Sequence, residues 1–226
     1  MVPRELLDTA PLPGGGTLRL VRRGDEYSIM LGANELMNSR KSGSEEALAA
    51  LAAAQLAGRR RPRVLIGGLG MGFTLRAAID RFGSDSEIVV AEIVPAVIAW
   101  AKGPLAHLFA DSLADPRVRI EAADVAALIR PGANWDAILL DVDNGPDGIT
   151  LETNDRLYTR TGLAAARGAL RRGGVLALWS AAPSPAFANR LRNAGFAVEE
   201  HVARVARGRG GRHVVWTARL SPALAP

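Results

Sequence analysis

A short apolar run that leads directly into a glycine-rich loop constrains the fold of this chain more than any other feature. The run is Val64-Leu65-Ile66, the loop is Gly67-Gly68-Leu69-Gly70-Met71-Gly72, and a helical pattern follows over residues 73–82. Glycine has no Cβ, so such a loop lets the backbone approach a ligand closely. The alternative is a tight turn with close packing. The order of strand, glycine loop and helix favours a ligand-binding loop.

Strand-like and helix-like segments alternate from Pro62 onward. Further strands are predicted at residues 87–91, 117–120, 136–140 and 175–179, with helices that begin at Pro95 or lie near residues 154–170 and 185–193. Such alternation implies a mostly parallel sheet with helices on both faces. The last two runs, residues 196–205 and 213–220, have the pattern of an antiparallel hairpin. The predicted fold class is therefore α/β, a Rossmann-like doubly wound sheet with a C-terminal antiparallel hairpin.

The first 42 residues have a different pattern. Residues 17–21 and 27–31 are short alternating stretches joined by a turn at Gly24-Asp25, and a second turn follows at residues 32–34. This pattern predicts a small N-terminal β-hairpin region over residues 1–42, ahead of a Rossmann-like domain over residues 43–226. The second region is expected to open with a helix that Ser44 caps and that ends near residue 57.

Composition excludes several kinds of site. The chain of 226 residues has no cysteine, which excludes disulfides, thiolate metal sites and a cysteine nucleophile. Its three histidines are scattered, so we expect no metal. No apolar run approaches the roughly 20 residues of a membrane span, and the first residues do not resemble a signal peptide. We therefore expect a cytoplasmic protein without a membrane partner.

The positive charge is less informative than it first looks. A net charge of +5 and a pI near 10.5 are compatible with nucleic-acid binding. However, Lys41 and Lys102 are the only lysines, so arginine carries nearly all of the positive charge. The abundance of alanine and glycine points to a general compositional bias. Nucleic acid stays open as a partner but is not favoured.

Two carboxylates follow predicted strands at the edge where ligands of such sheets bind. Glu92 ends the strand after the glycine loop, at about the spacing where a carboxylate accepts hydrogen bonds from ribose hydroxyls. Asp124 follows the next strand, where it would contact adenine, cap a helix, or do both. The loop reads GxGxG rather than the dinucleotide pattern GxGxxG, which favours a ligand of the S-adenosylmethionine type over NAD.

The chain resembles the spermidine synthase family. The similarity covers the glycine loop and its helix (residues 67–76), Val90-Ala91-Glu92-Ile93, residues 136–141, Leu157-Tyr158 and residues 170–176. That family also carries a small β-domain ahead of its Rossmann-like core, which matches the N-terminal hairpin pattern.

The resemblance implies an adenosyl site and an adjoining acceptor site. S-adenosylmethionine or its decarboxylated form would be the substrate, and the expected contacts are Gly68, Gly70, Met71, Gly72, Glu92 and Asp124. Asp141 would deprotonate an attacking amine, because a carboxylate can both orient the amine and accept its proton. Asp143, Asn144 and Tyr158 are the expected contacts of the small-molecule acceptor. The resemblance also implies a homodimer that forms through the N-terminal β-region.

The sequence departs from the family where polyamine chemistry is decided. Met71 stands where the family has an acidic residue, Asn144 stands near the family's second carboxylate with Asp143 beside it, and residues 43–46 replace a Tyr-His-Glu stretch. Glu45 and Glu46 could supply acid at the pocket rim, but we favour a role at the helix N-terminus.

Fewer carboxylates suit a diamine less well, so we expect methyl transfer ahead of aminopropyl transfer, with no acceptor assigned. The alternatives are a true aminopropyltransferase acting on a diamine, an NAD-dependent oxidoreductase, and a non-catalytic nucleic-acid-binding or scaffold protein.

Overall fold

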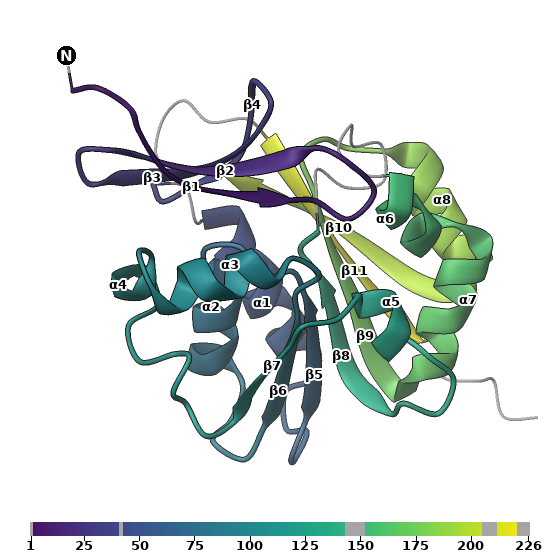
Figure 1. The fold of residues 1–226 in the computed structure, drawn as a ribbon. Helices are drawn as coiled ribbons and strands as arrows, with labels where there is room; N and C mark the ends of the chain where they lie inside the picture. The colour runs from purple at the N-terminus through teal and green to yellow at the C-terminus, as the bar shows by residue number, and fades with distance from the viewer. Residues whose placement is uncertain (1, 41–42, 143–151, 205–211, 221–226) are drawn as a thin grey trace, which may run out of the picture.

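The computed structural model describes residues 2–40, 43–142, 152–204 and 212–220. Within these residues the strands form two sheets (Figure 1). The larger sheet has seven strands in the order β10-β11-β9-β8-β5-β6-β7. Their bounds in chain order are β5 Arg63–Gly67, β6 Glu87–Ala91, β7 Val118–Glu121, β8 Trp135–Leu140, β9 Leu170–Ser180, β10 Phe196–Arg204 and β11 Arg212–Leu220.

The strand directions confirm the predicted fold class. β5 pairs in parallel with β6 and β8, β6 pairs in parallel with β7, and β8 with β9. β11 runs antiparallel to β9, and β10 runs antiparallel to β11. The sheet is therefore a mostly parallel, Rossmann-like sheet that ends in the antiparallel hairpin expected from the sequence.

Helices cover both faces of this sheet, as the alternation of strands and helices requires. One face carries α1 Gly43–Gln55, α2 Phe73–Arg81, α3 Pro95–Lys102 and α4 Ala106–Phe109, and the other carries α5 Val125–Leu128, α6 Glu152–Tyr158, α7 Arg160–Ala169 and α8 Pro185–Asn193. A separate hydrophobic cluster lies on each face of the sheet, and β5 contributes to both. Val64 and Ile66 belong to the cluster under α1 to α4, and Leu65 belongs to the cluster under α5 to α8. Alternate side chains of a strand point to opposite faces, so a strand buried on both faces is apolar throughout.

The second sheet is antiparallel and has the strand order β1-β2-β3-β4. Its strands are β1 Glu5–Pro11, β2 Thr17–Arg23, β3 Glu26–Leu31 and β4 Asn34–Asn38. Leu18, Leu20 and Ile29 are buried in the same hydrophobic cluster as α1 to α3. The small sheet therefore packs over the end of the large sheet from which these helices begin (Figure 1). The domain boundary at residue 42 stays a prediction.

Some local predictions were wrong. The single helix predicted near residues 154–170 is two helices, because Thr159 caps α7 and accepts a hydrogen bond from the Gly162 N–H at 3.1 Å. Strand β9 then begins at Leu170 instead of near Val175. Helix α1 begins at Gly43, so Ser44 lies inside it.

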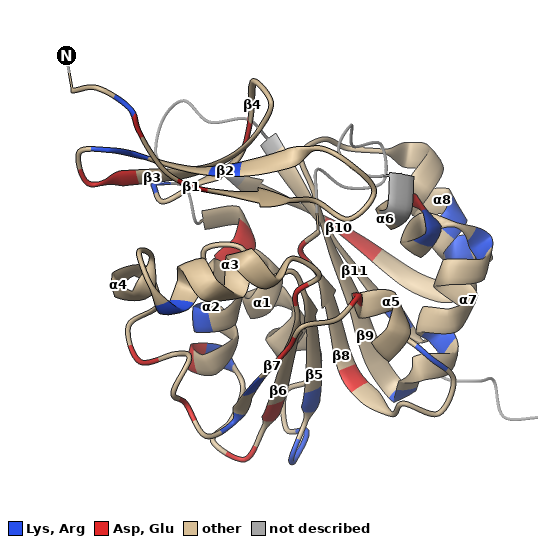
Figure 2. Cartoon of the chain, viewed as in Figure 1, with Lys and Arg blue, Asp and Glu red and all other residues tan. Residues whose placement is uncertain are grey.

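Charged side chains are distributed unevenly over the surface. Figure 2 shows basic residues gathered on α7 and α8, and these include Arg160, Arg167, Arg190 and Arg192. No helix in the described part of the chain is long and apolar enough to cross a membrane.

Candidate functional site

A cavity of about 110 Å³ lies between the carboxyl ends of the central parallel strands and the small N-terminal sheet. On the strand side it is lined by residues predicted as ligand contacts, namely Gly68, Gly70, Glu92, Asp124 and Asp141. The opposite wall is formed by apolar side chains of the small sheet: Leu18, Ile29, Leu31, Leu36 and Met37. Ligands of doubly wound sheets bind at this end of the strands, so the cavity is the candidate active site.

Some residues of the glycine loop line the cavity, and others pack in the protein core. Gly68 has a φ of 91°, and a Cβ there would collide with the backbone carbonyl oxygen of Asp141. Gly72 caps the N-terminus of α2 and faces the Phe109 ring. Met71 is only 2% exposed and belongs to the hydrophobic cluster. The described cavity lining includes Gly68 and Gly70 but neither Met71 nor Gly72.

Glu92 is a buried carboxylate at the cavity wall, 7% exposed. Its Oε2 accepts a hydrogen bond from the Leu69 N–H at 3.0 Å, and its Oε1 accepts one from the Val94 N–H at 2.8 Å. Burial raises the pKa of Glu92, and the backbone hydrogen bonds oppose that effect. These backbone bonds fix the orientation of the carboxylate at the cavity wall.

Asp124 caps α5, and the same side chain lines the cavity. Its Oδ1 accepts a hydrogen bond from the Ala126 N–H at 2.8 Å, and its Oδ2 forms an ion pair with Arg156 of α6. The two roles weighed from the sequence, helix cap and ligand contact, are therefore compatible in one side chain.

Asp141 follows β8 and is half-buried at the cavity wall. Burial raises the pKa of Asp141 to about 7, the negative charge of Glu45 adds to that rise, and a hydrogen bond from Thr74 opposes it. A carboxyl group that titrates near neutral pH is suited to accept a proton from a reacting group.

Among the other expected acceptor contacts, Tyr158 is the one that the structure describes. Tyr158 is buried, its hydroxyl donates to the Val142 carbonyl oxygen at 3.2 Å, and its ring packs edge-on against Phe187. Tyr158 is absent from the described cavity lining. Asp143 and Asn144 lie outside the described residues.

Sequence reasoning missed three contributions to the site. Thr74 lies in the segment that resembles the spermidine synthases, but nothing in its pattern indicates a contact with Asp141. Glu45 lies in the first turn of α1, as expected, and its charge also acts on Asp141. Asn154 of α6 lines the cavity. Each depends on a contact between distant segments, which spacing along one element does not reveal.

No protein-family model matches the chain. Among curated proteins, the polyamine aminopropyltransferases of Mycobacterium tuberculosis (strain CDC 1551 / Oshkosh) and Mycobacterium bovis (strain ATCC BAA-935 / AF2122/97) are each 33% identical over 152 residues. The matched region is 63% of this chain and 28% of the relative. The match thus spans little more than a quarter of the length of these relatives.

Solved structures give a wider match. The spermidine synthase from Thermotoga maritima has a TM-score of 0.74 at 17% identity, covering 96% of this chain and 73% of that one. A spermidine synthase in complex with the transition state analogue AdoDATO has a TM-score of 0.77 at 19% identity, covering 96% and 74%. A probable spermidine synthase from Corynebacterium glutamicum has a TM-score of 0.65 at 14% identity, covering 98% and 81%. The resemblance noted in the sequence is confirmed, and the chain has the fold of these spermidine synthases.

Proposed function

We propose that this chain transfers an aminopropyl group from decarboxylated S-adenosylmethionine to an amine. The observation that carries the proposal is Asp141, a carboxylate with a pKa of about 7 at the wall of a cavity that also holds Glu92 and Asp124. A base works best when its pKa lies near the working pH, and such a base typically contributes about 10²–10⁴-fold in rate.

The sequence favoured methyl transfer, and two findings weigh against that order. The curated relatives are named aminopropyltransferases, and the structural neighbours are named spermidine synthases. The argument for methyl transfer also used Met71 as a pocket residue in place of the family's acidic one, whereas the Met71 side chain is buried in the hydrophobic cluster. These relatives are transferases by name, so they give no support to the oxidoreductase or the nucleic-acid-binding alternative.

In the proposed reaction, Glu92 accepts hydrogen bonds from the ribose hydroxyls and Asp124 lies at the adenine. The lone pair of the acceptor amine forms a bond to the methylene carbon attached to the sulfonium. The carbon–sulfur bond breaks, its electron pair stays on sulfur, and methylthioadenosine leaves. Asp141 takes the proton that the amine nitrogen loses. The carboxylates at the wall suit both a sulfonium donor and an ammonium acceptor, because each carries positive charge.

Product analysis tests this proposal. The protein is incubated separately with S-adenosylmethionine and with its decarboxylated form, each with a panel of amines that includes putrescine. We expect methylthioadenosine from the decarboxylated donor, dependent on an amine and lost in Asp141→Asn. Asp111→Asn, which changes an exposed carboxylate outside the cavity lining, is the matched control and should retain activity.

Other outcomes would point elsewhere. Adenosylhomocysteine formed from S-adenosylmethionine would favour methyl transfer. Ligand binding without either product would indicate a binding protein. Tight binding of NAD with no response to adenosyl thioethers would favour the oxidoreductase.

We also propose that the chain forms a homodimer through its N-terminal sheet. The support is the resemblance to the spermidine synthase family, together with Leu6, an apolar side chain that is 56% exposed on the edge strand β1. Sedimentation of the protein and of Leu6→Glu tests this. A monomer in both would overturn the dimer.

A further inference from the structure

A chain of hydrogen bonds connects the C-terminal hairpin to the edge of the cavity. His213 of β11 lies with its Nδ1 2.9 Å from the Ser44 Oγ on α1, and the Ser44 hydroxyl lies 2.6 Å from Oε2 of Glu45. Ser44 is 1% exposed and Glu45 is half-buried. Two segments 169 residues apart in sequence thus meet beside the candidate base.

The direction of these bonds follows from the number of protons available. A serine hydroxyl has one proton, and a carboxylate only accepts, so the Ser44 hydroxyl donates to Glu45. The Ser44 oxygen must then accept from His213, which requires a proton on Nδ1. The arrangement therefore fixes which ring nitrogen of His213 donates. With a proton already on Nδ1, His213 does not accept the Ser44 proton, so this arrangement does not activate Ser44 as a nucleophile.

Glu45 is the member of this chain that acts on the site. Its negative charge helps to raise the pKa of Asp141. Its backbone carbonyl oxygen also lies 3.4 Å from the Thr74 hydroxyl, which donates to Asp141 at 2.5 Å. Glu45 therefore lies next to the Thr74–Asp141 pair and acts on Asp141 through space, because the single Thr74 proton goes to Asp141 and leaves none for the Glu45 carbonyl oxygen.

The charged groups around Asp141 come from several elements. Glu45 comes from α1, Glu92 follows β6, and Asp124 caps α5 and is paired with Arg156 of α6. Among these described groups, Glu45 is the one whose charge contributes to the raised pKa of Asp141. A change in where the Glu45 carboxylate points should therefore be seen at Asp141.

We propose that His213 is a positioning residue that, through Ser44, holds the Glu45 carboxylate beside Asp141. Its effect on the reaction rests on the proposed function, whereas its effect on the ionisation of Asp141 does not. Without the His213 donor, the Ser44 hydroxyl is free to rotate, and the half-buried Glu45 side chain can turn toward solvent. The like charge near Asp141 is then weaker, and the carboxyl group of Asp141 ionises at lower pH.

His213 also has a packing role, which the test must separate from hydrogen bonding. Its ring meets Trp179 edge-on, with 4.7 Å between the ring centroids. His213→Phe keeps a ring against Trp179 and removes the donor. His213→Asn loses the ring but can place an amide N–H near the position of Nδ1.

The experiment measures Asp141 directly by carboxyl-carbon NMR titration of the protein without substrate, and in parallel measures the dependence of the transferase rate on pH. We expect His213→Phe to move the Asp141 titration to lower pH by on the order of half a pH unit, because the like charge of Glu45 is weakened. Ser44→Ala should give the same shift, and the double variant no further shift, because both remove one chain of bonds. His213→Asn should restore most of the wild-type titration.

His201→Phe is the matched control. His201 lies on β10, is also half-buried, and is hydrogen-bonded to Thr217 at 3.1 Å, away from the described cavity lining. It should leave the Asp141 titration unchanged. An unshifted Asp141 titration in His213→Phe, or equal shifts in the Phe and Asn variants, would overturn the proposal. The expected shift in a protein that forms no methylthioadenosine would support the positioning role while the proposed function fails.

Discussion

Thr74 of α2 donates a hydrogen bond to Asp141 at the end of β8, with 2.5 Å between the two oxygen atoms. Thr74 is the second residue of the helix that Gly72 caps, so the helix that follows the glycine loop also contacts the candidate base. This hydrogen bond favours the charged form of Asp141, against the burial and the Glu45 charge that favour the neutral form. The pKa of about 7 is the balance of these effects.

Replacing Thr74 by valine should raise the pKa of Asp141 above 7. Valine has a similar shape and no hydroxyl, so the effect that favours the charged carboxylate is lost while burial and Glu45 remain. A base must be deprotonated to act, so the rising limb of the pH–rate profile should move to higher pH. The measurement is the rate of methylthioadenosine release between about pH 5 and pH 9.

Thr74→Ser keeps the hydroxyl and is the control. Its pH–rate profile should lie close to that of the wild type. If the valine variant lost activity equally at every pH, Thr74 would affect the packing of α2 and not the ionisation of Asp141.

Asp141→Asn should make the folded protein more stable at alkaline pH. The folded-state pKa of about 7 lies above the ordinary value of 3.8, so between these pH values the folded state binds more protons than the unfolded state. The stability contributed by Asp141 is thus full below pH 3.8, is lost as pH rises toward 7, and stays low above it. Asparagine does not ionise. The free energy of unfolding at pH 8 should therefore rise by roughly 2–4 kcal/mol in the variant.

Denaturant unfolding at pH 5 and at pH 8 checks this expectation. The gain should be larger at pH 8, and Asp111→Asn, at an exposed position, should show little change at either pH. A gain of equal size at both values would mean that Asp141 destabilises the fold for a reason other than its ionisation.

The sequence predicted the large sheet because its strands are buried on both faces. A run such as Val64-Leu65-Ile66 has no polar position that would suit solvent. The edge strands β1 and β4 were not predicted, since most of their residues are exposed or half-exposed and no buried alternation marks them. The break between α6 and α7 was missed because Thr159 reads as an ordinary helix residue until its cap hydrogen bond is seen.

The candidate site was predictable where it depends on strand ends. Glu92, Asp124 and Asp141 each follow a parallel strand, and the topology alone brings them to one edge. The apolar wall from β2–β4 and the contact between His213 and Ser44 come from tertiary packing of separate segments. Met71 was expected to contact the ligand because it lies in the glycine loop. Its position in the sequence does not reveal that its side chain is buried in the core.

Gly68→Ala should destabilise the protein more than an alanine at an ordinary left-handed glycine. Gly58 has a similar φ, +80° against +91°, but nothing lies within 4 Å of a Cβ built there. Gly58→Ala should cost about 1–2 kcal/mol from backbone strain alone. Gly68→Ala adds a collision with the Asp141 carbonyl oxygen, which moves only if the cavity wall moves.

Thermal unfolding and calorimetric binding of methylthioadenosine measure both consequences. Gly68→Ala should be the less stable variant and should bind the thioether more weakly, whereas Gly58→Ala should bind it as the wild type does. Equal stability of the two variants would show that the loop relaxes around a methyl group.

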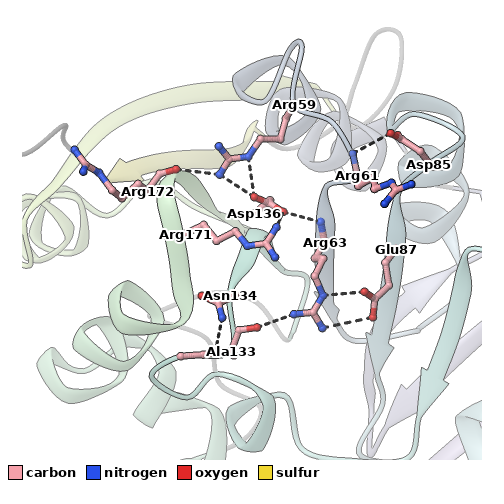
Figure 3. Close-up of polar contacts among 11 residues, drawn as sticks. Arg59, Arg61, Arg63, Asp85, Glu87, Ala133, Asn134, Asp136, Arg171 and Arg172 are labelled. Carbon is pink, nitrogen blue, oxygen red and sulfur yellow. Dashed lines mark hydrogen bonds and ion pairs between the residues drawn. The ribbon is translucent and has the colours of Figure 1, made fainter.

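Asp136 at the start of β8 anchors the end of the sheet opposite the cavity (Figure 3). The carboxylate is fully buried, and it accepts hydrogen bonds from the Arg59 Nε at 2.8 Å, from the Arg63 backbone N–H at 2.8 Å and from the Arg171 guanidinium at 2.9 Å. In contrast, the neighbouring pair of Arg63 and Glu87 has side chains that are 29% and 45% exposed. Asp136 and Glu87 thus both pair with arginine, but the Asp136 carboxylate is buried and the Glu87 carboxylate is exposed to solvent.

Asp136→Ala should lower the free energy of unfolding by about 1–3 kcal/mol, because it leaves the backbone N–H of Arg63 without its acceptor and removes the shared partner of Arg59 and Arg171, whose side chains are 34% and 41% exposed. Glu87→Ala should cost about 0–1 kcal/mol, since solvent already screens that pair. Denaturant unfolding at pH 7 gives both values. Both variants should bind methylthioadenosine as tightly as the wild type, because neither residue belongs to the described cavity lining. Equal, small losses of stability would mean that hydration of Arg59 and Arg171 replaces their hydrogen bonds to Asp136 at little cost. The network around Asp136 would then not stabilise this end of the sheet.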